Sequence, residues 1–94
     1  MIQRDGDRLI VTAPMRMGSA QALLSDGLRL IGSGQQLTID LSAVADLDSS
    51  SLAVMLAWTR MANLQRSTVR FSGIPPAAKS LADLYGVRDL FSEA

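Results

Sequence analysis

The residues with the most chemical potential in this chain form an aspartate–serine cluster at positions 46 to 51, within the stretch ADLDSSSL. Asp48 is followed by Ser49, Ser50 and Ser51, and an apolar run begins directly after them. An aspartate or serine at a helix start accepts hydrogen bonds from free amides of the first turn, a contact worth about 1 kcal/mol. Those amides also favour a phosphate group. The cluster therefore predicts a helix cap, formed by Asp48 or Ser49, and a surface hydroxyl that can meet a partner or be phosphorylated.

A different use of the same region would be a carboxylate site made by Asp40, Asp46 and Asp48 for a cation or for acid–base catalysis. No base, nucleophile pair or phosphate-binding glycine motif accompanies these carboxylates. The chain also has no histidine and no cysteine, which excludes Ser-His and thiol catalysis and the usual zinc sites. Asp40 is better suited to satisfying nearby backbone donors. We therefore expect no catalytic residue, no metal and no cofactor.

Composition limits the classes of partner. The 94 residues predict a single domain, 1–94, and 48% of them are hydrophobic, enough for a core with apolar surface left over. Nine basic and nine acidic residues give zero net charge, and the basic ones are scattered, so we expect no nucleic-acid binding. No small-molecule substrate is indicated. Neither a signal-peptide pattern nor an apolar run of membrane-spanning length is present, which predicts a cytoplasmic protein.

The elements that must position the cluster follow from periodicity. Alternating apolar residues predict strands, and apolar residues spaced by three and four predict helices. Asp5-Gly6 is a hairpin signal, Ser19 is a candidate helix cap, and Pro75-Pro76 presets a helix start. The expected strands cover residues 2–4, 8–12, 36–41 and 67–73, and the expected helices cover 19–31, 50–65 and 77–85. This β-β-α-β-α-β-α order predicts an α/β fold, a four-stranded mixed sheet with helices mainly on one face.

The helix that follows the serines is apolar on most of its sides. Met55 lies along one edge, and Trp58 and Met61 lie along another. Such a helix is either deeply buried or shared with a partner. Trp58 is the single tryptophan, a residue type enriched at interface hot spots, so it is a candidate for either core or interface. The predicted partner-binding set is Asp48, Ser49, Ser50, Ser51, Met55, Trp58 and Met61.

The stretches "IDLSAVADLDSSSLAVML" and "IPPAAKSLADLYGV", with the strand between them, resemble the STAS domain family over roughly residues 38–91. This is the family of bacterial anti-sigma-factor antagonists and sulfate-transporter tails. The resemblance implies a STAS-like fold and places Ser49 where the family has its phosphorylatable or partner-contacting serine or threonine. The family usually has glycine where this chain has Ser51.

Two stretches that overlap these, "LAVMLAWTRMANLQ" and "LADLYGVRDLF", are similar to one branch, the STAS subunit of the Mla phospholipid transporter. That resemblance implies a non-catalytic accessory subunit that binds the ATPase of a phospholipid-transporting ABC system. It would be peripheral to the inner membrane through this partner and would contact the membrane only indirectly. The alternative is an anti-sigma-factor antagonist whose partner is an anti-sigma factor kinase and which is regulated by phosphorylation of Ser49.

Overall fold

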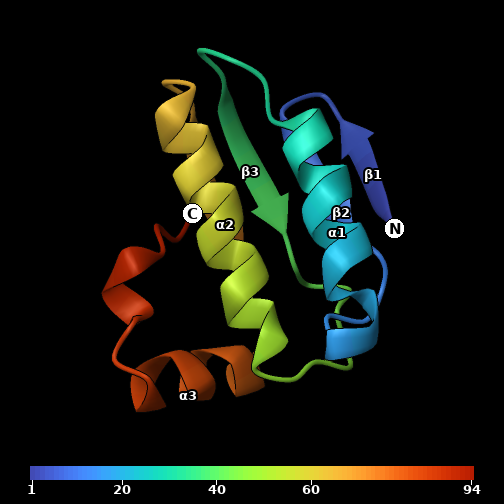
Figure 1. The fold of residues 1–94 in the computed structure, drawn as a ribbon, viewed down its shortest axis with the longest axis vertical. Coiled ribbons are helices and arrows are strands. Elements are labelled where there is room, and N and C mark those ends of the chain that lie inside the picture. Colours follow the sequence, from blue (N-terminus) through green and yellow to red (C-terminus); the bar gives the residue numbers. More distant parts are fainter.

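The computed structural model describes residues 1–94 and has the predicted α/β order (Figure 1). A single four-stranded sheet has the strand order β1-β2-β3-β4. The strands are β1 (Ile2–Asp5), β2 (Arg8–Val11), β3 (Gln36–Asp40) and β4 (Thr68–Ser72). The helices are α1 (Met17–Leu30), α2 (Ser50–Leu64) and α3 (Pro76–Leu84), and a short 3-10 helix, η1 (Arg88–Leu90), follows them.

The sheet is mixed because a tight turn joins β1 to β2, whereas longer connections that contain a helix join β2 to β3 and β3 to β4. β1 and β2 are antiparallel and are joined by a tight turn in which Gly6 has a φ of 60°, a conformation that glycine adopts without steric cost. β2 with β3 and β3 with β4 are parallel, since α1 and α2 serve as the crossover connections. The predicted four-stranded mixed sheet is confirmed.

Residue alternation along the strands decides which face of the sheet is covered. Leu37 and Ile39 of β3 are buried, whereas Thr38 and Asp40, between and after them, are half-buried. Figure 1 shows α1 and α2 side by side on the near face of the sheet, with α3 at the lower end of α2. The apolar strand residues therefore meet the helices, and the opposite face stays polar.

Trp58 lies at the centre of the core and has no exposed surface. Its indole fits against α1 because position 27 is glycine, where an added Cβ would lie 2.0 Å from Trp58 Nε1. The glycine that weakens α1 by propensity is therefore required by the packing of α1 on α2. Of the two roles open to Trp58, core residue and interface residue, the structure assigns the first.

The start of α1 differs from the expected one. The helix begins at Met17, so Ser19 lies inside the first turn and is not the N-cap residue, as the sequence had suggested. The Ser19 hydroxyl accepts a hydrogen bond from the Arg16 amide at 3.2 Å and donates to the Pro14 carbonyl. The two additional helical residues form because the free Met17 amide finds an acceptor in Asp48, a residue distant in sequence. None of the helices is both long and apolar enough to cross a membrane.

Candidate functional site

The aspartate–serine cluster lies in the connection from β3 to α2, and the segment before α1 runs beside it. The Met15 amide donates to the Asp46 carbonyl at 3.0 Å, and the Asp48 amide donates to the Met15 carbonyl at 3.1 Å. Met15 and Leu47 form an isolated parallel bridge. These backbone bonds hold the start of α1 against the start of α2, so both helices present their N-termini at the same end of the molecule.

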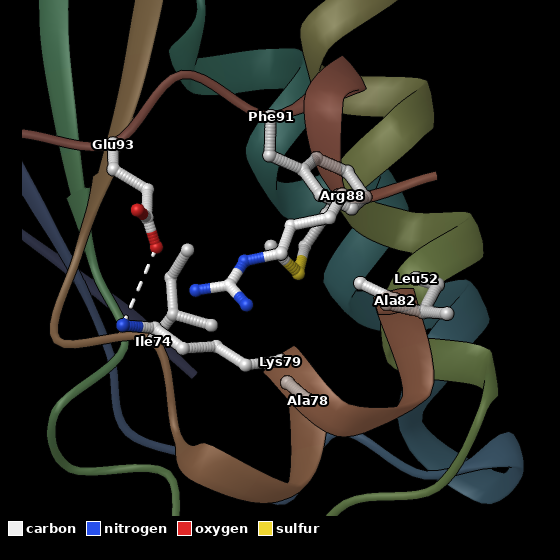
Figure 2. Close-up of a pocket in the computed structure, with 9 residues that line it drawn as sticks. Leu52, Ile74, Ala78, Lys79, Ala82, Arg88, Phe91 and Glu93 are labelled. Atoms are coloured by element: carbon white, nitrogen blue, oxygen red, sulfur yellow. Dashed lines mark ion pairs between the residues drawn. The ribbon is translucent and has the colours of Figure 1, made fainter. Parts of the chain in front are cut away.

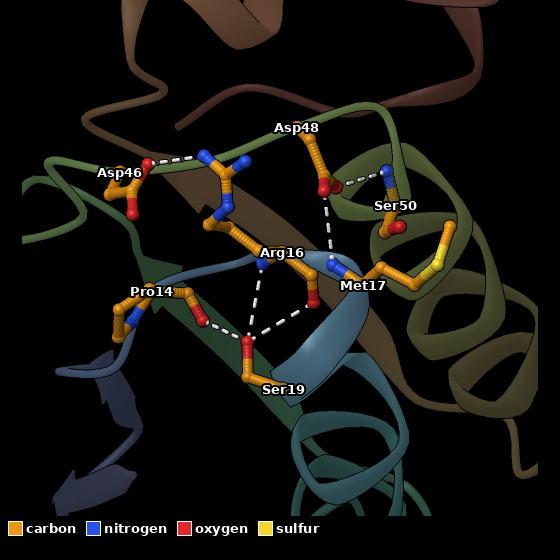
Figure 3. A network of polar contacts seen from close by, with 7 residues as sticks. All are labelled: Pro14, Arg16, Met17, Ser19, Asp46, Asp48 and Ser50. Carbon is orange, nitrogen blue, oxygen red and sulfur yellow. Dashed lines mark hydrogen bonds and ion pairs between the residues drawn. The ribbon is translucent and has the colours of Figure 1, made fainter.

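Asp48 caps both of these helices with one carboxylate (Figure 3). Its Oδ1 accepts from the Ser50 amide at 2.8 Å, and its Oδ2 accepts from the Met17 amide at 3.1 Å. The hydrogen bonds from the Met17 and Ser50 amides lower the pKa of Asp48. Ser49 makes no capping hydrogen bond with its side chain. Of the two predicted caps, Asp48 is therefore the one used, and the exposed Ser49 hydroxyl is free of that role.

Arg16 neutralises the neighbouring acid of the cluster. Its Nη1 lies 2.7 Å from Asp46 Oδ1, and about half of each side chain is exposed. The hydrogen bond and the charge of Asp46 raise the pKa of Arg16, with a smaller contribution from the charge of Asp48. Since the ion pair is solvent-exposed, its role is mainly to fix the position of the loop, with little stabilisation.

Asp40, Asp46 and Asp48 do not form a group that could hold a metal ion. Asp40 accepts from the Ser42 amide at 2.9 Å and from the Ser42 hydroxyl at 2.6 Å, and these bonds are the main cause of its lowered pKa. It also pairs with Arg8 at 3.3 Å on the polar face of the sheet. No group of three or more acidic residues could hold a metal ion. Asp40 therefore satisfies local donors, as expected, and is not part of a cation-binding group with Asp46 and Asp48.

The structure separates the predicted partner-binding residues into two sets. Ser49 is exposed, and Asp48, Ser50 and Met61 are half-buried. Ser51, Met55 and Trp58 are buried, contrary to the prediction that they face a partner, because at most 1% of each residue is exposed. With Ala62 they form the stripe of α2 that faces the sheet, at spacings of four, three and four residues. While residues 91–94 are in place, a partner on the surface of the domain cannot contact this stripe.

One surface residue beside the cluster is missing from that predicted set. Met17 is 79% exposed, and its backbone is tied to Asp48. A shallow groove between α1 and α2 continues from this point and is lined mainly by Ala20, Leu24, Ala53 and Val54. We call Met17, Asp48, Ser49, Ser50 and Ala53 the Ser49 face. The sequence offered no signal for Met17, because its proximity to Asp48 is a long-range contact between two helix starts.

Solved structures of similar fold cover almost the whole chain. The chain is similar to an anti-sigma-factor antagonist (STAS) domain protein from Planctomyces limnophilus, with a TM-score of 0.74 and 15% identity over 99% of this chain and 86% of that one. It is similar to an RsbS variant from Moorella thermoacetica, with a TM-score of 0.71 and 24% identity over 100% of this chain and 84% of that one. A sulfate transporter family protein from Wolinella succinogenes gives a TM-score of 0.70 and 13% identity, over 92% and 70% of the two chains. The TM-scores show a shared fold, and at these low identities they show the fold alone.

Sequence comparison gives the family. A comparison with curated protein sequences finds no match. The family model described as "Mlab, STAS domain" matches residues 2–92, nearly the full length of the chain. The match includes the hairpin and α1 as well as the segment from β3 onward that resembles the family most clearly. The chain therefore belongs to the Mlab, STAS domain family.

Proposed function

We propose that this protein is a non-catalytic accessory subunit that binds and supports the ATPase of a phospholipid-transporting ABC system. The observation that carries the proposal is the free Ser49 hydroxyl at the start of α2. Because Asp48 caps the helix, Ser49 is not needed for that purpose and can serve a partner. The family match agrees with this branch of STAS proteins. The protein would be cytoplasmic and peripheral to the inner membrane through its partner, without cofactor or small-molecule substrate.

The Ser49 face has the composition of a small protein interface. Met17 supplies exposed apolar area, and Ala53 is small enough for close approach of a partner backbone. Ser49 and Asp48 supply polar contacts at the centre. Met61, farther along α2, extends the same helix surface with a half-exposed apolar side chain. Protein interfaces combine apolar contact area with a limited number of direct hydrogen bonds, and the Ser49 face offers both.

A second function, that of an anti-sigma-factor antagonist switched by a kinase, is favoured by the same exposed hydroxyl and by the fold shared with antagonist proteins. A phosphate on Ser49 would add nearly two negative charges beside the ionised Asp48. The nearest cation of the cluster, Arg16, is already paired with Asp46. Phosphorylation would therefore make the Ser49 face strongly negative and repel an acidic partner.

The test is a calorimetric titration of the protein with the ATPase subunit encoded beside it or co-purified with it from native membranes. Ser49→Glu should weaken binding at least tenfold, because it places a charge at the centre of the interface. Ser25→Glu, on the exposed side of α1 away from the Ser49 face, is the matched control and should bind normally. Normal binding of Ser49→Glu would refute this interface. A failure to bind any ATPase, with a mass increase of one phosphate after treatment with a cognate kinase and ATP, would favour the second function.

A further inference from the structure

The outer edge of β4 is paired with the last residues of the chain. The Phe71 amide donates to the Ser92 carbonyl, and the Ala94 amide donates to the Phe71 carbonyl, both at 2.8 Å. Phe71 and Glu93 thus form an isolated parallel bridge, the beginning of a fifth strand. Residues 68 and 72 bond toward β3, so by alternation Val69 directs its backbone groups toward the same outer edge as Phe71. The residues after η1 cover only part of this edge.

Side chains of the same segment cover an apolar hollow between α2 and α3 (Figure 2). Phe91 is 8% exposed and meets Phe71 edge-to-face, with ring centroids 5.8 Å apart. Glu93 Oε1 lies 3.5 Å from Lys79 Nζ at the mouth of the hollow. Arg88, which pairs with Asp83 at 2.9 Å, also lines it. The floor consists of Leu52, Met55, Ile74, Ala78 and Ala82.

We propose that the β4 edge and this hollow form a second interaction surface, which residues 91–94 occupy in the free protein and which an extended segment of a protein partner takes by displacing them. The residues now seated there define the chemistry of that segment: an aromatic residue, followed two positions later by a carboxylate. The aromatic ring replaces Phe91 against Phe71, and the carboxylate replaces Glu93 beside Lys79. Added-strand recognition works in this way, with backbone bonds giving affinity and side-chain pockets giving specificity.

The contacts that hold residues 91–94 are few enough for a partner segment to displace them. Residues 91–94 are held by the burial of the Phe91 ring, which contacts Phe71, by two backbone hydrogen bonds to Phe71, and by one ion pair whose two side chains are more than 40% exposed. Exposed ion pairs contribute little stability. When the segment leaves, Lys79 loses its partner, the Phe71 amide loses its acceptor, and the apolar floor is uncovered. A partner segment that lacks the carboxylate or the aromatic ring would leave one of these groups unsatisfied. This surface is independent of the partner proposed for the Ser49 face.

The first test is hydrogen exchange of the unmodified protein, read residue by residue by NMR. The Phe71 and Ala94 amides should exchange at least tenfold faster than the Thr68 and Leu41 amides, which bond to the Gln35 and Ser72 carbonyls across the β3–β4 pair. Faster exchange means that the segment opens while the sheet stays intact. Equal exchange rates at all four amides would overturn the proposal, since the edge would then open only on global unfolding.

The second test uses a labelled peptide with the sequence of residues 88–94, RDLFSEA, and fluorescence anisotropy. Glu93→Lys, which sets a cation against Lys79 and loosens the segment, should bind the peptide at least fivefold more tightly than the unmodified chain. Adding Lys79→Glu restores the pair with reversed charges and should return the affinity to the weaker value. A control peptide carrying Phe91→Ala and Glu93→Lys should not bind.

Equal, weak binding of both peptides to the Glu93→Lys protein would overturn the proposal. A concentration-dependent dimer of the unmodified protein that the RDLFSEA peptide dissociates would identify the occupant as a second copy exchanging its own residues 91–94. That result would overturn the assignment of the surface to a different protein.

Discussion

Asp48 and Met17, 31 positions apart, meet where two helices begin, and the Asp48 carboxylate accepts the Met17 amide at 3.1 Å while its other oxygen accepts the Ser50 amide. One side chain therefore satisfies the first turns of both α1 and α2. The bond from the Ser50 amide frees Ser49 from capping, and the bond from the Met17 amide holds the exposed Met17 beside Asp48. The stability of the domain and the shape of its proposed partner surface thus depend on the same residue.

Replacing Asp48 by asparagine should remove one of its two capping hydrogen bonds and keep the other. The amide group has only one acceptor atom, so one helix-start N–H would face an NH2 donor and lose its bond. We expect Asp48→Asn to lower Tm by roughly 4–8 °C, the effect of one lost cap in a domain of this size. Differential scanning calorimetry measures the change. Asp89→Asn, which removes an exposed carboxylate with no ion pair, is the control and should leave Tm nearly unchanged. Equal Tm values for Asp48→Asn and the unmodified protein would show that the double cap contributes nothing.

The lowered pKa values of Asp40 and Asp48 predict an acid-sensitive fold. Each carboxylate is stabilised in its ionised form by hydrogen bonds in the folded state. The stability that these bonds contribute is fully present above the unfolded pKa of about 3.9 and is lost as the pH falls through the lower folded pKa. Urea unfolding at pH 6 and at pH 2.5 should therefore show a smaller pH dependence for Asp48→Asn than for the unmodified protein.

The two acids lie in separate hydrogen-bond networks, so the double variant with Asp40→Asn should lose pH dependence additively. An unchanged pH dependence in both single variants would contradict the proposed linkage between these carboxylates and acid unfolding.

Ser51 offers a stabilising substitution. Its hydroxyl oxygen is buried without a hydrogen-bond partner, in a residue that is 1% exposed. Ser51→Ala removes this unsatisfied group and leaves almost no cavity, so we expect a gain of about 1 kcal/mol in the free energy of unfolding. Alanine also has the higher helix propensity, and Ser25→Ala on the exposed side of α1 measures that part alone. A gain for Ser51→Ala no larger than that for Ser25→Ala would mean that the hydroxyl has a partner in solution.

Gly27 should be intolerant of even one methyl group. Gly27→Ala places a Cβ 2.0 Å from Trp58 Nε1, and the indole cannot move because Trp58 is fully buried. Overpacking of this kind costs about 1–3 kcal/mol, more than the gain in helix propensity of about 1 kcal/mol. Gly18→Ala in the same helix is the matched control, since nothing lies within 4 Å of its added Cβ. Chemical denaturation should show a loss for the first variant and no loss for the second.

Local patterns were sufficient for the elements of the fold, because their causes lie within a few residues. The Asp5-Gly6 turn, the alternation of Leu37 and Ile39, and the helix start at Pro75-Pro76 all produced the predicted structure. Crossover geometry then restricts two strand pairs to parallel pairing, which made the mixed sheet predictable as well.

The same local patterns predicted only part of the candidate site around Ser49. The sequence showed the Asp48–Ser49 pair before a helix and indicated that either residue could be the cap. Which side of α2 faces the sheet was not, because apolar residues occur around most of that helix. Packing against Gly27 placed Trp58 in the core and left the other side of the helix for solvent or a partner.

The remaining features required the tertiary structure, because each joins residues that are far apart in the chain. The bond from the Met17 amide to Asp48 and the pairing of residues 92–94 with Phe71 of β4 are both contacts of this kind. No local propensity favours them, and they form only when the sheet brings its strand ends and helix ends together. The sequence by itself thus determined the elements and the position of Ser49, whereas long-range packing decided which side chains around Ser49 a partner can reach.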